Sequence, residues 1–74
     1  MSNTDKLTVK LNRNDNVATA LRKLDIGEIT QNLRSVNEIP KGHKIALKNI
    51  LKGEKIIKYD QLIGIARKDI FVGQ

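Results

Sequence analysis

The segment 39–44, which reads IPKGHK, is the stretch of this sequence that most resembles a reactive motif. Proline fixes its own φ and glycine accepts a positive φ, so Pro40 and Gly42 predict a tight turn. That turn presents His43 and Lys44 at the start of the next strand. If the strand is already regular there, the two side chains point to opposite faces, and only one can reach a given ligand.

His43 is the first candidate for proton transfer or for binding a carboxylate, because histidine exchanges a proton near neutral pH. A lone histidine beside a turn more often has a structural role, in which it donates a hydrogen bond to a backbone carbonyl. The residues alone leave both interpretations open.

Other reactive arrangements find little support in the residue types. Neither Ser2 nor Ser35 has a setting that would activate a nucleophile. One histidine without any cysteine cannot form a zinc site of the usual spacing. The glycines are never spaced as in a phosphate-binding loop and are interpreted as turn residues. We therefore expect no metal and no cofactor to be bound by this chain.

The charge balance points to anionic partners in general. Fourteen Lys and Arg against eight Asp and Glu give a net charge of +6, which raises the local concentration of anions. Nucleic acid fits poorly, because the bases alternate with acids, and one Tyr and one Phe offer almost no stacking surface. A small carboxylate substrate, an acidic partner surface and a simple solubilising face all remain compatible with the charge.

Length and composition predict one small domain in a reducing compartment. The 74 residues are enough for a single domain, 1–74, in which we expect residues 1–5 to be a disordered tail. The absence of cysteine fits the cytoplasm, and neither a signal segment nor an apolar run of about 18 residues predicts membrane insertion.

Hydrophobic periodicity predicts a strand followed by a helix near the N-terminus. Over residues 7–11, Leu7, Val9 and Leu11 alternate with polar residues, as in a strand with one buried face. A short helix is then expected to start at Asn14 or Asp15 and to end at Gly27. Its apolar face would consist of Val17, Ala20, Leu21 and Leu24.

The rest of the chain is predicted to be strands. Residues 28–38 suggest one irregular strand, and three short apolar runs at 44–47, 55–59 and 62–66 are bounded by glycine or polar turns. Each run is too short for a helix.

An internal repeat with an offset of twenty residues is the most informative structural feature. It pairs Ile45, Ala46, Lys48, Ile50 and Gly53 with Ile65, Ala66, Lys68, Ile70 and Gly73, and Asn49 with Asp69. Each copy predicts a strand end, a capped turn, a buried isoleucine and a glycine bend, which together form a strand-to-strand corner. Because the second copy stops at Gln74, we expect the native protein to continue or another chain to supply the next strand.

An ordered set of motifs over residues 5–74 resembles the N-terminal SAF domain of altronate dehydratase, galactarate dehydratase and the small subunit of sulfolactate sulfo-lyase. The resemblance implies a mainly β fold, a small β-clip of short bent strands. The motifs are Asp15-Asn16-Val17-Ala18, Gly27, Ile39-Pro40-x-Gly42-His43-Lys44-x-Ala46-Leu47, Ile50-x-x-Gly53-Glu54, Ile57-Lys58-Tyr59, Ile63-Gly64-x-Ala66 and Asp69-Ile70-x-x-Gly73.

Enzymes of that family remove water, or sulfite in one branch, from hydroxylated acids, and a much larger domain or subunit carries most of the active site. The resemblance therefore implies an accessory domain of a hydro-lyase, with a large catalytic domain or subunit and an anionic sugar acid as its partners. We expect no activity from the isolated chain, and any divalent metal to be held by the partner domain.

The resemblance also implies site residues. His43 and Lys44 fall in the Gly-His-Lys signature and become candidates for substrate binding, with His43 also a catalytic candidate. Lys58 and Tyr59 are further candidates, although an ordinary strand end explains that pair equally well. Asp60 departs from the family pattern, which usually has glycine after the Lys-Tyr pair, and this puts the direction of Tyr59 in doubt.

Asp15 and Asn16 fall in the Asp-Asn-Val signature and are the remaining candidates for substrate contact. The alternative for both is the capping of the predicted helix. The family pattern commonly continues after the last glycine with a Val-His-x-His-Asn strand, which lies beyond Gln74.

Two functions of other classes remain open on the sequence. One is a small basic β module that binds nucleic acid or acidic carbohydrate without chemistry. The other is an assembly adaptor that self-associates through an open strand edge near Phe71 and Val72.

Overall fold

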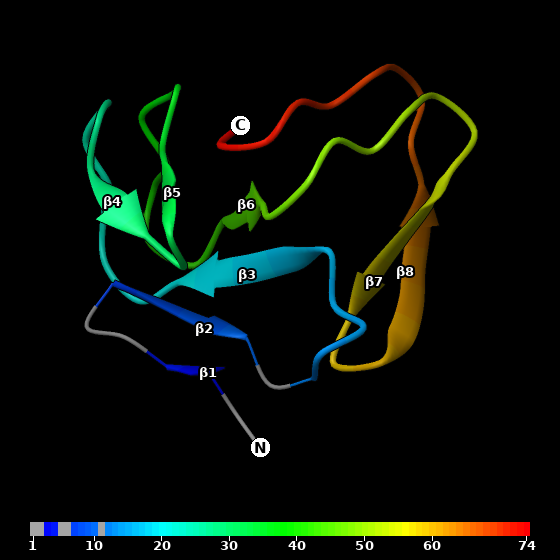
Figure 1. Cartoon of the computed structure of the whole chain (residues 1–74), viewed down its shortest axis with the longest axis horizontal. Helices are drawn as coiled ribbons and strands as arrows, with labels where there is room; N and C mark the ends of the chain where they lie inside the picture. The colour runs from blue at the N-terminus through cyan, green and yellow to red at the C-terminus, as the bar shows by residue number, and fades with distance from the viewer. Residues whose placement is uncertain (1–2, 5–6, 11) are drawn as a thin grey trace.

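The computed structural model describes residues 3–4, 7–10 and 12–74 and consists of short bent strands joined by turns (Figure 1). The strands are β1 (Asn3–Thr4), β2 (Thr8–Lys10), β3 (Val17–Ala20), β4 (Ile29–Thr30), β5 (Leu33–Arg34), β6 (Lys44–Ala46), β7 (Lys55–Lys58) and β8 (Gln61–Ile65). The prediction of a mainly β domain is confirmed. Since the described residues form no helix, none of them belongs to a helix long and apolar enough to cross a membrane.

A four-stranded antiparallel sheet, in the order β1-β2-β3-β6, forms the centre of the molecule, and β4-β5 and β7-β8 are separate hairpins. In the register of β3 with β6, Ala18 faces Ile45 and Val17 faces Ala46. Successive side chains of a strand point to opposite faces. These two pairs therefore line opposite faces of the sheet.

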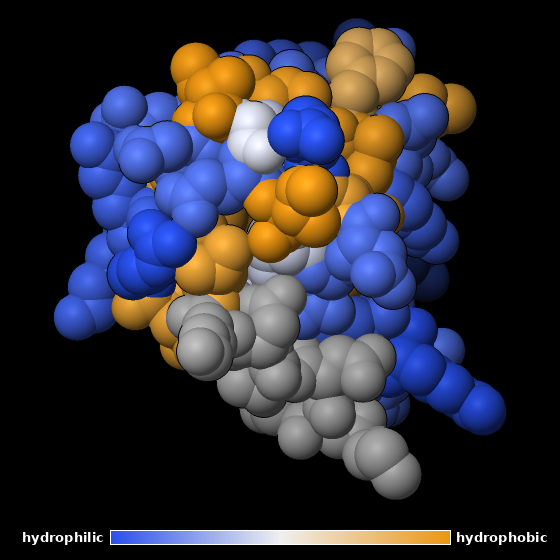
Figure 2. All heavy atoms as spheres, turned by 60° about the vertical axis from the view of Figure 1, so that its left-hand side comes forward, coloured by the Kyte–Doolittle hydropathy of each residue, from blue (hydrophilic) through white to orange (hydrophobic). Residues whose placement is uncertain are grey.

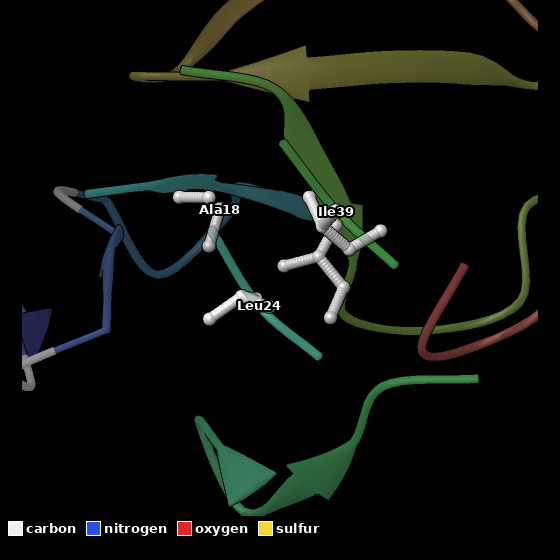
Figure 3. Close-up of a cluster of buried hydrophobic side chains, with 5 residues drawn as sticks. Ala18, Leu24 and Ile39 are labelled. Atoms are coloured by element: carbon white, nitrogen blue, oxygen red, sulfur yellow. The ribbon is translucent and has the colours of Figure 1, made fainter. Parts of the chain in front are cut away.

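Both faces of β3 and β6 are buried, each under its own apolar cluster. One cluster consists of Ala18, Ala20, Leu24, Ile39 and Ile45. The other consists of Val17, Ala46, Ile50 and Ala66. In Figure 3, Ala18, Leu24 and Ile39 point toward one another from three separate segments. The small alanines let the surrounding chain approach β3 closely from both sides.

Four corners of one design surround this sheet, at residues 20–28, 35–43, 46–54 and 66–74. Each begins with a small residue, continues with an aliphatic residue four positions later and reaches a glycine three positions after that. The small residues are at most 3% exposed. The four glycines have φ between 84 and 91°, a region that residues with a Cβ atom resist. The twenty-residue repeat found in the sequence is therefore half of a fourfold pattern.

The corners bond to each other in two pairs, by the same six backbone hydrogen bonds of 2.7–2.9 Å. The two aliphatic residues exchange bonds, Leu24 with Ile39 in the first pair and Ile50 with Ile70 in the second. Each glycine N–H donates to the small residue of the opposite corner. The small residue in turn donates to the carbonyl that follows the opposite glycine. The two corners of each pair are thus related to each other by an approximate two-fold axis.

A hairpin connects the two corners of each pair, β4-β5 in the first pair and β7-β8 in the second. Both hairpins turn through two residues with positive φ, Gln31-Asn32 and Tyr59-Asp60. This is the geometry of a type I′ turn, whose twist matches that of the flanking strands. From residue 20 onward, the chain is therefore two copies of corner, hairpin and corner (Figure 1).

The predicted helix at residues 15–27 is wrong. Residues 17–20 form the central strand β3, and Leu21, assigned to the buried helix face, is 43% exposed. The error has a physical cause. A strand buried on both faces shows no alternation of apolar and polar residues, and Val17-Ala18-Thr19-Ala20 is such a strand. The β-branched Val17 and Thr19 favour the extended conformation.

The other predicted elements are largely confirmed, with local differences. The predicted strands at 44–47, 55–59 and 62–66 correspond to β6, β7 and β8, whereas 28–38 is the hairpin β4-β5 instead of one irregular strand. In β2 the most buried side chain is that of Thr8, which bonds to Thr30 Oγ1 at 2.6 Å.

Three predictions concern the ends of the chain: a disordered tail at residues 1–5, a first strand at 7–11 and an open strand edge near Phe71 and Val72. Residues 3–4 of the expected tail form β1, and residues 1–2 and 5 lie outside the described residues, as does Leu11 of the predicted first strand. Near the C-terminus, Gly73 N–H bonds to Ala46 and Gly73 C=O accepts from Val36 N–H. The backbone there is already paired, although the side chains of Phe71 and Val72 are half-exposed.

Gly73→Ala should destabilise the domain far more than Gly53→Ala. Both glycines have φ 89°, so alanine at either position costs about 1–2 kcal/mol of conformational strain. A Cβ at Gly73 would also overlap the carbonyl oxygen of Arg34, while at Gly53 it meets nothing within 4 Å. We expect a total loss of at least ~3 kcal/mol for Gly73→Ala, measured by urea unfolding. Equal losses for the two variants would contradict the contact between the last corner and β5.

Candidate functional site

His43 and Lys44 lie where the second corner passes into β6. Both residues are exposed. The backbone of His43 is fixed, because its N–H donates to Pro40 and its carbonyl accepts from Ala20 N–H. Lys44 lies opposite Thr19 in the sheet register. Neither side chain has a hydrogen-bond or ion-pair partner within the part of the chain that the structure describes, so both heads are available to an external anion.

The position of His43 in its corner differs from the equivalent position in the other three. In those corners the residue after the glycine is Glu28, Glu54 or Gln74. Its side-chain oxygen accepts the N–H of the residue after the corner's aliphatic side chain, at 2.6–2.9 Å. In the second corner that N–H does not exist, because the residue is Pro40. The second corner therefore needs no side-chain acceptor at this position, and the imidazole of His43 makes no capping hydrogen bond.

Asp15 and Asn16 are buried and hold the second hairpin to the sheet. Asp15 Oδ1 accepts the N–H of Asp60 at 2.7 Å, within the β7-β8 turn. Asn16 Nδ2 donates to Lys55 C=O at 2.8 Å, and its Oδ1 accepts Ile57 N–H at 2.7 Å. These side chains cap a hairpin and a strand edge, where the sequence suggested a helix start.

Lys58 and Tyr59 lie at the β7-β8 turn and contact each other. The ammonium of Lys58 lies 4.7 Å from the centroid of the Tyr59 ring, within the range of a cation–π interaction. Asp60 has φ 59°, the conformation that a glycine adopts easily and that Asp tolerates better than most residues. The replacement of the family's glycine is therefore accommodated without loss of the turn.

The structure separates the candidate residues into two groups at opposite ends of β3. Asn16 precedes the strand and anchors the hairpin that carries Lys58 and Tyr59. His43 is bonded to Ala20, the last residue of the strand. Four residues at roughly 3.3 Å each place these ends on the order of 13 Å apart. One small ligand cannot contact both groups closely.

An open groove of about 420 Å³ lies at the Asn16 end of β3. It is lined by Asn14, Asn16, Lys48, Asn49, Ile50, Gly53, Glu54, Lys55 and Ile57. Its charged lining residues are Lys48, Lys55 and Glu54, whereas the amide of Asn16 is already bonded to β7. The sequence did not indicate this groove, because Asn14 and Asn16 reach residues 48–57 only through contacts between segments far apart in the chain.

Among the described residues, no three His, Cys, Asp or Glu side chains lie close enough together to hold a metal ion. The carboxylates of Asp15, Glu28 and Glu54 instead accept backbone N–H groups. The candidate residues thus offer cationic and hydrogen-bonding groups on a rigid backbone.

The sequence profile of the altronate/galactarate dehydratase SAF domain matches residues 6–74, nearly the whole chain. The chain belongs to this family. The family resemblance drawn from the motifs around His43 is confirmed, and the structure supplies the reason why several of these motifs recur. Four of their glycines, Gly27, Gly42, Gly53 and Gly73, are corner residues with positive φ.

Two curated proteins are similar to this SAF domain over most of its length. Altronate dehydratase of Bacillus subtilis (strain 168) is 37% identical over 73 residues, which cover 93% of this chain and 15% of that protein. Altronate dehydratase of Escherichia coli (strain K12) is 41% identical over 69 residues, covering 88% of this chain and 14% of that protein. The SAF domain thus corresponds to a small part of much larger dehydratase chains.

Asn16→Ala should cost about 2–3 kcal/mol of folding free energy, because it leaves a backbone donor and acceptor of β7 unpaired. Asn14→Ala is the matched control. Asn14 Nδ2 bonds to Asp60 Oδ1 at 3.2 Å on the exposed surface, and its loss should cost less than about 0.5 kcal/mol. Chemical unfolding of the two variants measures the difference. Similar values for both would show that Asn16 does not anchor the hairpin.

The first corner carries a charge-dependent cap. The N–H of Asp25 bonds to the Glu28 carboxylate, and this bond lowers the pKa of Glu28 from its ordinary 4.5, helped by the side chain of Arg22 at 2.7 Å. A depressed folded-state pKa means that Glu28 stabilises the fold above its unfolded pKa. That stabilisation is lost as the pH falls through the folded pKa.

Glu28→Gln should make the first corner insensitive to pH. The amide oxygen of the introduced glutamine can still accept the N–H of Asp25, as Gln74 accepts the N–H of Phe71. Unlike a carboxylate, the amide does not take up a proton as the pH falls. We expect the wild type to be more stable than the variant at pH 7, and the gap between their unfolding midpoints to shrink at pH 3. A gap that stays constant over this range would contradict the role of the charge.

Proposed function

We propose that this chain is the accessory SAF domain of a sugar-acid hydro-lyase and that it contributes substrate-side contacts to a larger catalytic region. Removal of water from a hydroxy acid breaks a C–H bond next to the carboxylate and a C–O bond on the neighbouring carbon. A base must accept the proton, and an acid or a metal must assist the departing hydroxyl. A domain with a single histidine would supply at most part of these groups, and the rest of the enzyme would supply the others.

The release of His43 from capping is the observation that carries this proposal. Three corners use a Glu or Gln at this position to complete their own hydrogen bonds. The second corner, with Pro40 in place of the N–H donor, holds a histidine on the same fixed backbone, next to an unpaired lysine. An imidazole held on a rigid backbone can contact a carboxylate or a hydroxyl without first being ordered.

Altronate is the first substrate to examine, because both similar curated proteins are altronate dehydratases. Galactarate follows from the description of the family. Both are anionic, and the net charge of +6 would raise their concentration near this domain. His43 would contact the substrate carboxylate or a hydroxyl, and Lys44, the next residue along, would contact the substrate or the catalytic region.

The test is a chimera in which this chain replaces the matching region of the Bacillus subtilis altronate dehydratase. The decisive variant is the double substitution Pro40→Ala and His43→Gln. It restores both the N–H and the acceptor found in the fourth corner, so the fold should stay within about 1 kcal/mol of the wild type. We expect the chimera to dehydrate altronate and the double variant to lose at least tenfold in kcat/KM, since a hydrogen bond to a charged group contributes about 1.5–3 kcal/mol.

Two controls make this test decisive. Glu28→Gln keeps the cap of the first corner and should leave the activity of the chimera within twofold. The 74-residue chain alone should show no dehydration. Full activity of the isolated chain, or unchanged activity of the Pro40→Ala/His43→Gln chimera, would overturn the role assigned to His43.

A further inference from the structure

The second hairpin presents an unpaired edge strand. β7 and β8 pair only with each other, and the outer edge of β8 has no partner among the described strands. An edge strand carries a row of backbone N–H and C=O groups that can pair with another strand. β8, at five residues, is the longest strand of the structure.

The other edge of this hairpin is already occupied. Asn16 bonds through its backbone N–H to Ile57 C=O at 3.0 Å, and its side chain contacts Ile57 N–H and Lys55 C=O. β7 is therefore bonded on both sides, to β8 and to Asn16. Asp15 fixes the turn between the strands. The hairpin is held rigidly, with its one free edge directed outward.

Large apolar side chains follow this free edge. Leu62, Ile63 and Ile65 are 56%, 45% and 51% exposed, and Tyr59 at the turn is 39% exposed. Ile63 lies at the bulge of β8, where the register of the hairpin shifts and no residue of β7 faces it. Three half-exposed aliphatic side chains lie within five residues of this edge strand. Such an edge favours association with another strand that covers them.

A second apolar face exists but is built differently. Figure 2 shows that the side of the molecule carrying β4 and β5 has apolar surface interrupted by hydrophilic residues. Ile29 in β4 is 60% exposed and Ile26 beside it is 71% exposed. β4 and β5 have only two residues each, so they offer a short edge to an added strand.

Charge decides which partner suits the free edge of β8. The hairpin and the residues that flank it carry four cationic side chains, Lys55, Lys58, Arg67 and Lys68. The three carboxylates there are those of Asp60, Glu54 and Asp69, and the last two accept backbone N–H groups of the third corner. Pairing two copies of the chain through β8 would bring these sets together, and like charges across a strand pair are destabilising. An apolar strand flanked by Asp or Glu would be attracted instead.

We propose that β8 accepts an added strand from the catalytic region of the dehydratase, apolar in its centre and acidic at its flanks. This inference depends on the proposed function, because the similar dehydratases devote about 85% of their length to sequence outside the region that this chain matches. Strand addition supplies affinity through the backbone and specificity through alternate side chains. It would also orient the whole domain, since β8 pairs with β7 and β7 is bonded to Asn16, next to β3.

Hydrogen exchange in the chimera described above tests the added strand directly. Amides of residues 61–66 should exchange at least tenfold more slowly in the chimera than in the 74-residue chain, while the amides of β4 should differ by less than twofold. Ile63→Glu in the chimera should abolish this protection by placing a carboxylate against the apolar centre of the added strand. Ile29→Glu, which changes an even more exposed isoleucine on the other face, should keep it.

The outcomes separate the inference from the function on which it rests. Protection retained in Ile63→Glu, or protection lost in Ile29→Glu instead, would overturn the assignment of β8. Protection in the 74-residue chain alone that rises with protein concentration would assign the edge to a second copy and also overturn it. A chimera that is inactive and shows no protection would reject the proposed function, whereas an active chimera with an unprotected β8 would reject only the docking edge.

Discussion

Reciprocal hydrogen bonding between corners is the constraint on which the rest of this structure depends. A domain this short cannot bury a large core, and its two apolar clusters contain mostly alanine and isoleucine. Twelve backbone bonds, six in each corner pair, close the chain upon itself at residues far apart in sequence. Glycines at φ near 90° make the bends that bring the corners together. The hairpins and the central sheet are held in place by these bonds.

The same repetition explains how a small domain can hold functional side chains rigidly. Each corner fixes the backbone of the residue after its glycine, because that carbonyl accepts a bond from the opposite corner. Three corners use the side chain there for their own stability, and the second corner, through Pro40, leaves it free. The residue after the glycine therefore has a structural role in three corners and is available for a function in the second. His43 occupies the free copy, with Lys44 next to it.

The sequence predicted the strand class, the three C-terminal strands and two of the four corners, because each depends on local patterning. It missed the first corner because Ala20, Leu24 and Gly27 also fit a helical spacing. The two corner–hairpin–corner units do not appear in the sequence as one repeat of fixed length. The reason is that the hairpin β4-β5 is shorter than the hairpin β7-β8, so the spacing between corners differs. Among site residues, the motif located His43 and Lys44, but the work of Asp15 and Asn16 is visible only in contacts more than 35 residues away in sequence. The groove at Lys48 and Lys55 depends on the same long-range contacts.

Native-state hydrogen exchange on the 74-residue chain tests most directly whether the corner pairs hold the fold. The most slowly exchanging amides should be those of Leu24, Ile39, Ile50 and Ile70 and of the glycines beside them, and the amides within each pair should open together in rising denaturant. Protection confined to β2, β3 and β6, with the corner amides exchanging early and independently, would contradict this account and assign the stability of the domain to its central sheet.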